Sequence, residues 1–148
     1  MAQVTIIVGS MYGNAENLAL KVQETMQSQG VTSTVLMNAT IDDVTKADNL
    51  LFITSTTGQG DLPDNIQPVF SQMQAQFPML TGKKVGVIGL GDTSYGDTYC
   101  GAGKQLYALI EELNAALPVP MLEVDACEYF DPWEVAEAWL TTWVTKLR

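Results

Sequence analysis

Three short segments of this 148-residue chain combine glycine with hydroxyl or aromatic side chains, and each directly follows an apolar run. The first, residues 9–16, precedes apolar residues that recur every four positions, as in a helix. Because the first helical turn has unpaired N–H groups and a partial positive charge, small polar residues there can surround a phosphate without any Lys or Arg. A simpler interpretation is that Ser10 or Asn14 caps the helix. The segment matches neither the Walker A motif nor G-x-G-x-x-G.

The second and third segments have the composition of a binding site for a flat ring. Residues 54–63 carry hydroxyl groups that can complete a phosphate site, and two glycines that let the backbone approach a ring or reorient a peptide cheaply. Residues 89–104 contain Tyr95 and Tyr99, which can stack on an aromatic ligand. The alternatives are a mere connecting loop and ordinary packed surface tyrosines.

The elements that must position these segments follow from five apolar runs, which predict strands over residues 3–8, 32–37, 49–54, 84–90 and 120–124. Helical spacing predicts helices from Asn14 to Gly30, over 41–46, over 66–77, from the region of Leu106 to a stop at Pro118, and over 132–147. Strict alternation of strand and helix indicates an α/β fold: a doubly wound five-stranded parallel sheet with helices on both faces. Ligands bind such sheets at the carboxyl ends of the strands, where the three segments lie. We expect a single domain over residues 1–148.

Composition excludes several kinds of function. The chain has no histidine, so it cannot build a Ser-His-Asp site or a zinc site that uses imidazole. Its formal charge of −10 argues against nucleic acid and anionic membranes as partners and favours basic protein surfaces. Residues 105–145 contain eight carboxylates without any Lys or Arg, which is either a docking face or simply a solvated surface. No apolar run is long enough to span a membrane. We expect no metal site, a cytoplasmic location and free thiols at Cys100 and Cys127.

The residues SMYGNAE (10–16), STTGQGD (55–61) and GLGDTSY (89–95) resemble the three flavin-binding loops of short-chain flavodoxins, in the same order and spacing. The resemblance covers essentially the whole chain, and the last strand lacks a long insertion. It implies the strand order 2-1-3-4-5 and one noncovalently bound FMN. The FMN phosphate would contact Ser10 and the backbone of residues 11–15, with help from Ser55 and Thr56.

The same resemblance assigns residues to the isoalloxazine ring. The Asp92 backbone would meet the pyrimidine edge, Tyr95 would stack on the outer face, and the Gly58–Gln59 peptide would reorient when the flavin gains its first electron. Ala15 stands where the family often has a hydroxyl, and Thr57 where many members have an aromatic residue. The expected cofactor-binding residues are Ser10, Met11, Tyr12, Gly13, Asn14, Ala15, Ser55, Thr56, Thr57, Gly58, Gln59, Gly60, Asp61, Gly91, Asp92, Tyr95, Tyr99 and Cys100.

The resemblance implies a low-potential electron carrier without catalytic residues of its own. It would take electrons from an NADPH-dependent flavoprotein reductase, pass them to redox enzymes with basic docking surfaces, and work as a monomer. Carboxylates near the ring, such as Asp61, Asp92 and Asp97, would oppose a second negative charge on the flavin. One alternative is an FMN-dependent oxidoreductase acting on a small substrate such as a quinone. A phosphoryl receiver domain would need an acidic cluster after the first strand and an aspartate at the end of the third, and neither residues 8–10 nor Thr54 and Ser55 provide them.

Overall fold

The computed structural model describes residues 3–10, 13–56, 60–91, 100–125 and 131–147 of the chain. Strands and helices alternate along these residues, as the apolar runs predicted. The strands are β1 (Gln3–Gly9), β2 (Thr32–Leu36), β3 (Asn49–Ser55), β4 (Lys84–Gly91) and β5 (Leu122–Asp125). The helices are α1 (Asn14–Ser28), α2 (Ile41–Lys46), α3 (Gln67–Gln76), α4 (Gly101–Glu112) and α5 (Trp133–Thr145).

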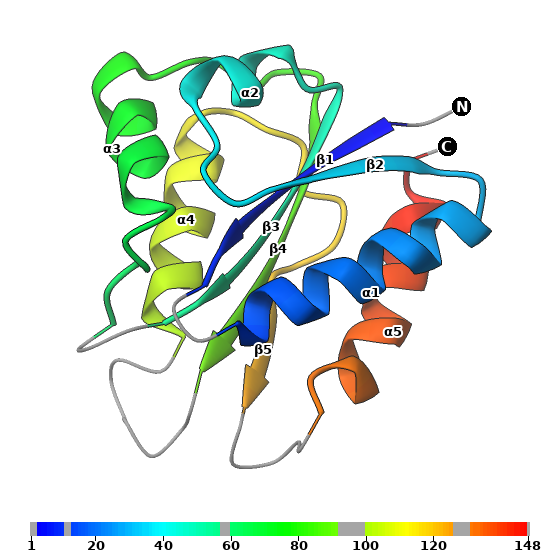
Figure 1. Cartoon of the computed structure of the whole chain (residues 1–148). Helices are drawn as coiled ribbons and strands as arrows, with labels where there is room; N and C mark the ends of the chain where they lie inside the picture. Colours follow the sequence, from blue (N-terminus) through cyan, green and yellow to red (C-terminus); the bar gives the residue numbers. More distant parts are fainter. Residues whose placement is uncertain (1–2, 11–12, 57–59, 92–99, 126–130, 148) are drawn as a thin grey trace.

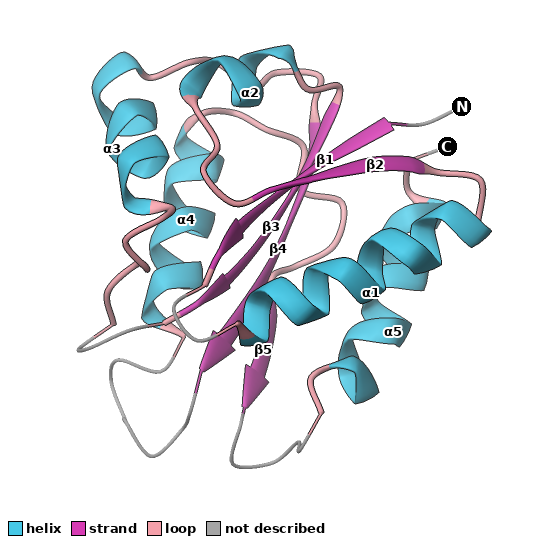
Figure 2. Ribbon diagram, viewed as in Figure 1, coloured by secondary structure: helices cyan, strands magenta, loops and turns pink. Residues whose placement is uncertain are grey.

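All strand pairs are parallel, and the order across the sheet is β2-β1-β3-β4-β5. The predicted doubly wound sheet and its strand order are therefore confirmed. Helices α1 and α5 lie on one face, while α3 and α4 lie on the other, with α2 beside α3 (Figure 1). The strand arrows run in one direction (Figure 2), so the segments that follow β1, β3 and β4 leave the sheet at its carboxyl edge.

Two apolar cores explain why the central strands read as continuous apolar runs. Along β3, Leu50 and Phe52 pack into the core beneath α3 and α4, whereas Leu51 and Ile53 pack into the core beneath α1 and α5. All four side chains are fully buried. A strand with helices on both faces has no solvent-facing side, so the alternation typical of half-exposed strands is absent.

The edges of the sheet differ slightly from the prediction. Strand β2 ends at Leu36, one residue before the predicted 37, and β5 runs from Leu122 to Asp125 rather than over 120–124. Both are edge strands, and most of their residues are only partly buried or exposed. Burial constrains their ends less, so an apolar run locates them less sharply than it locates a central strand.

Two helix ends were predicted wrongly. Helix α4 stops at Glu112, well before Pro118, because the chain turns at Asn114, whose φ of 65° lies in the left-handed region. Helix α3 ends at Gln76, so Phe77 is not part of its apolar face; Phe77 adopts φ 47° and is 46 % exposed. Both ends are set by a non-glycine residue with positive φ, which is uncommon and gives no clear signal in a sequence.

Helix α5 packs on β4 through a close tryptophan contact. The Trp139 and Trp143 rings are stacked with their centroids 6.1 Å apart, and Trp143 is fully buried. A Cβ atom at Gly86 would lie 2.7 Å from the Trp139 ring and 2.8 Å from Trp143 Nε1, so the strand can accept the pair only without a side chain there. The described residues contain no helix long and apolar enough to cross a membrane.

Candidate functional site

Helix α1 begins just beyond the carboxyl end of β1, and no described side chain caps its first turn. The N-cap residue is Gly13, whose φ of 91° lies in the region that favours glycine. The Ser10 hydroxyl accepts a hydrogen bond from Gly13 N–H at 3.0 Å and keeps its own proton to donate. The interpretation that Ser10 or Asn14 merely caps the helix is therefore not supported. Uncapped N–H groups at a helix start form an anion-binding arrangement.

The side chain of Ala15 contributes no hydrogen-bond donor to this anion site. Ala15 is fully buried and packs in the core beneath α1 and α5. Any phosphate bound there would depend on backbone N–H groups and on the Ser10 hydroxyl. The exposed Glu16 is the ionisable side chain of the first turn. This turn, Asn14–Asn17, therefore contains no cation, and anion binding there relies on the helix end itself.

The second of the three segments, residues 54–63 (the second loop), is held against the start of α4 at both sides of residues 57–59. On one side, the Thr56 hydroxyl accepts a hydrogen bond from Ala102 N–H at 3.3 Å. On the other, Gln105 Nε2 donates to the Gly60 carbonyl at 2.7 Å. A Cβ atom at Gly101 would lie 2.7 Å from Gly60 Cα, so the two backbones are in direct contact. Both ends of the segment are therefore fixed in relation to α4.

The third segment, residues 89–104 (the third loop), is fixed in a similar way. Gly91 and Cys100, which flank residues 92–99, are in contact with each other. A Cβ atom at Gly91 would lie 2.7 Å from Cys100 N and 2.8 Å from its Sγ. Cys100 is fully buried with φ 51°, and its thiol donates to the Gly89 carbonyl at 3.5 Å. Cys100 forms no disulfide bond, as predicted, whereas Cys127 lies outside the described residues.

The structure brings the described members of the predicted site to one edge of the sheet in two groups. Ser10, Gly13, Asn14 and Ala15 form the group at α1. The second group lies at the ends of β3 and β4 and at the start of α4, and direct contacts join several of its members: Ser55, Thr56, Gly60, Asp61, Gly91 and Cys100. The other predicted residues lie outside the described part of the chain: Met11, Tyr12, Thr57, Gly58, Gln59, Asp92, Tyr95 and Tyr99.

Two polar residues outside the predicted site hold these loops in place. Gln105 binds the Gly60 carbonyl, and Asn65 binds backbone groups of Val8, Ser10 and Met37. Gln105 had no signal beyond its place in the first turns of α4. Asn65 follows the second loop within the polar stretch Asp64–Asn65, which reads as an ordinary turn.

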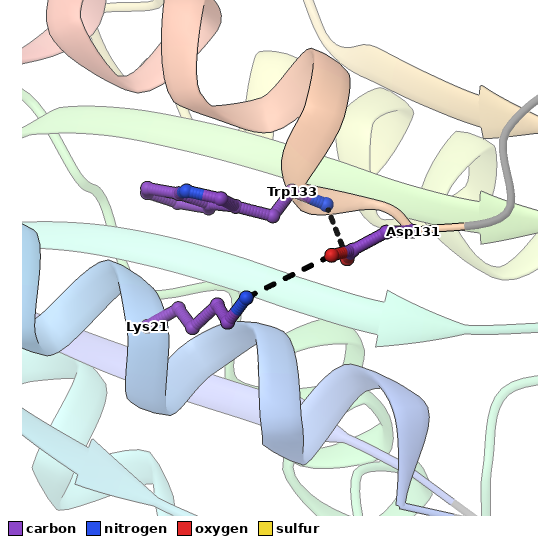
Figure 3. Close-up of polar contacts among 3 residues, drawn as sticks. All are labelled: Lys21, Asp131 and Trp133. Carbon is purple, nitrogen blue, oxygen red and sulfur yellow. Dashed lines mark hydrogen bonds and ion pairs between the residues drawn. The ribbon is translucent and has the colours of Figure 1, made fainter.

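An ion pair connects α1 with the start of α5 (Figure 3). Asp131 accepts a hydrogen bond from Trp133 N–H at 3.0 Å, and its other carboxylate oxygen lies 3.7 Å from Lys21 Nζ. The side chains of Lys21 and Asp131 are 54 % and 47 % exposed, so solvent screens the pair and its contribution to stability is small. The carboxylate acts mainly on the first N–H group of α5, where negative charge is favourable.

Comparison with known proteins decides between the possible ligands. The family model for flavodoxin matches residues 6–139. The chain belongs to the flavodoxin family. Flavodoxin YqcA of Escherichia coli is 38 % identical over 149 residues, and an uncharacterized protein of Pseudomonas aeruginosa is 42 % identical over 149 residues; each alignment covers 99 % of both chains. The solved structure of a cysteine-to-alanine variant of a Pseudomonas aeruginosa flavodoxin superposes with a TM-score of 0.91 at 41 % identity, covering 98 % of both chains.

Membership of this family settles the general chemistry of this flavodoxin. Flavodoxins bind FMN and carry electrons rather than turning over a substrate, so the cofactor is FMN and the role is FMN-based electron transfer. The residues present fit such a cofactor, because a phosphate needs donors at one end and a flat ring needs close backbone approach at the other. The start of α1 offers the first, and the contacts of Gly60 with Gly101 and of Gly91 with Cys100 hold the ends of the two loops that would supply the second.

Proposed function

We propose that residues 1–148 act as one FMN-binding domain that carries electrons from an NADPH-dependent flavoprotein reductase to acceptor enzymes. The observation that carries the proposal is the start of α1, where uncapped N–H groups meet the Ser10 hydroxyl beyond β1. The phosphate of FMN would bind the Ser10 hydroxyl and the N–H groups of Asn14 and Ala15. When bound, FMN supplies reversible electron transfer, and the protein supplies binding and orientation.

The ring of FMN would lie between the second and third loops, beside α4. The Thr56 and Gly60 contacts to α4 support this position, as does the contact between Gly91 and Cys100. Ser55 and Asp61 belong to the same proposed site. So do the remaining predicted residues: Met11, Tyr12, Gly13, Thr57, Gly58, Gln59, Asp92, Tyr95 and Tyr99. Fixed loop ends would keep the ring in one orientation while the middle of the second loop adjusts to the redox state.

Negative charge supports the choice of partner. Exposed carboxylates lie at the end of α4, on edge strand β5 and along α5: Glu111, Glu112, Glu123, Glu134 and Glu137. A partner with a basic surface would be attracted to this negative charge, and electrostatic attraction raises the rate of encounter more than the final affinity. The same charge disfavours nucleic acid and anionic membranes. We propose a monomer that works in the cytoplasm, where the buried Cys100 thiol stays reduced.

One experiment tests this function. Purified protein is incubated with excess FMN, freed of unbound flavin and examined by absorbance for the FMN-to-protein ratio. The proposal predicts a ratio of about one and reduction of the bound flavin only when a flavoprotein reductase and NADPH are both present. Failure to retain FMN would refute the proposal. Steady consumption of NADPH with a quinone and no added reductase would instead favour the oxidoreductase alternative.

A further inference from the structure

The Asn65 carboxamide connects three segments that are far apart in the sequence. Its Oδ1 accepts a hydrogen bond from Ser10 N–H at 2.9 Å. Its Nδ2 donates to the Val8 carbonyl at 2.7 Å and also to the Met37 carbonyl. The side chain therefore uses its acceptor and both of its donors on backbone groups. A single half-buried residue ahead of α3 binds the residues on either side of Gly9 and the residue that follows β2.

These contacts lie where the pairing of β1 with β2 stops. The last paired residues are Ile7 and Leu36, so Val8 and Met37 would form the next pair if the ladder continued. Instead, the Asn65 amide group binds both of their carbonyls. On its other side β1 stays paired with β3 as far as Gly9. Asn65 thus replaces the lost β2 partner at the point where the chain leaves the sheet for the loop of residues 10–13.

Packing beside Asn65 fixes the same point. A Cβ atom at Gly9 would lie 2.5 Å from Thr54 Oγ1 and 2.7 Å from Ile66 Cγ2, so Gly9 is enclosed between β3 and the residue after Asn65. The Ile66 N–H group donates to the Pro63 carbonyl at 3.1 Å, which closes the turn that presents the Asn65 side chain. The point where the chain leaves β1 and enters the first loop is therefore set by the residues at the end of the second loop as well as by β1.

We propose that Asn65 is a positioning residue for the FMN phosphate. By holding Ser10 N–H and the Val8 carbonyl, it fixes the direction in which the chain leaves β1. It thereby fixes how the Ser10 hydroxyl and the first turn of α1 present their donors. No other residue type of this size provides one acceptor and two donors, so substitution releases the loop. This inference rests on the proposed function, since it assigns the phosphate to the start of α1.

The test compares the affinities of wild-type protein and the Asn65→Ala variant for FMN and for riboflavin, which lacks the phosphate. Asn65→Ala should weaken FMN binding about tenfold and riboflavin binding less than twofold, because only FMN uses the phosphate donors. The matched control is Asn49→Ala. Asn49 Nδ2 donates to the Gln3 carbonyl at 2.9 Å, which is a similar link between strands at the opposite edge of the sheet. This control should change neither affinity more than twofold.

A second measurement needs no variant. In wild-type protein without flavin, the Ser10 amide should exchange with deuterium slowly, although it lies beyond the end of β1. If Asn65→Ala does not fold, Asn65→Ser replaces it in the same titrations. Equal loss of FMN and riboflavin binding, no loss of either, or fast exchange at Ser10 would overturn the role of Asn65. Wild-type protein that binds no FMN would overturn the proposed function itself, and this inference with it.

Discussion

Adding one methyl group at Gly101 should displace the second loop and weaken flavin binding. In Gly101→Ala the new Cβ would lie 2.7 Å from Gly60 Cα and 2.8 Å from the Gly60 carbonyl oxygen, both rigid backbone atoms. Ordinary contacts begin near 3.4 Å, so the two backbones must separate by about 0.7 Å. Overpacking of this kind costs about 1–3 kcal/mol, and the better helix propensity of alanine offsets at most about 1 kcal/mol.

The assay combines urea unfolding with FMN titration, and Gly103→Ala is the matched control. Gly103 lies in the same helix, but its Cβ would meet Gly89 Cα at 3.1 Å and the flexible Met121 Sδ at 3.2 Å, away from the second loop. We expect Gly101→Ala to lower the free energy of unfolding by up to about 2 kcal/mol and to raise the Kd for FMN at least fivefold. Gly103→Ala should leave the Kd within twofold. An unchanged Kd for Gly101→Ala would refute the idea that contact with α4 positions the second loop for the flavin.

Three further outcomes follow from the fold and its charge. Asp131→Ala should lower the free energy of unfolding by about 1 kcal/mol because α5 loses the acceptor for Trp133 N–H. Lys21→Ala should lower it by less, since the ion pair is exposed. Equal effects of the two variants in thermal unfolding would contradict this. Trp143→Phe should destabilise the protein far less than the roughly 3–5 kcal/mol expected for Trp143→Ala, because the described residues give buried Trp143 Nε1 no hydrogen-bond partner to lose. Similar urea midpoints for the two variants would contradict this expectation. Electron transfer from a reductase with a basic surface should slow several-fold between 50 and 500 mM salt, and stopped-flow rates independent of salt would argue against charge-guided docking.

The central strands were predictable because their surroundings are uniform. Strand β3 is buried on both faces, so nearly every residue from Leu50 to Ile53 had to be apolar. The short helix α2 was also predicted correctly over 41–46, and a capping box between Thr40 and Asp43 marks its start. In these elements the local sequence pattern and the surroundings in the folded protein favour the same secondary structure.

Other features depend on contacts that local sequence does not encode. The turn at Asn114 ends α4 before the more obvious signal at Pro118. Asn65 sits 55 residues from Ser10, and only the folded sheet brings them within hydrogen-bond distance. The composition and spacing of neighbouring residues identified the three loops as a candidate site, but they could not identify the residue that joins the first loop to the second.

The most direct test of the phosphate site is a comparison of backbone amide NMR shifts when FMN or riboflavin is added to the flavin-free protein. The account predicts that the amide resonances of Asn14 and Ala15 move strongly with FMN, and much less with riboflavin, because only the phosphate accepts their hydrogen bonds. FMN binding that leaves both resonances in place would contradict the central claim that the uncapped start of α1 holds the cofactor.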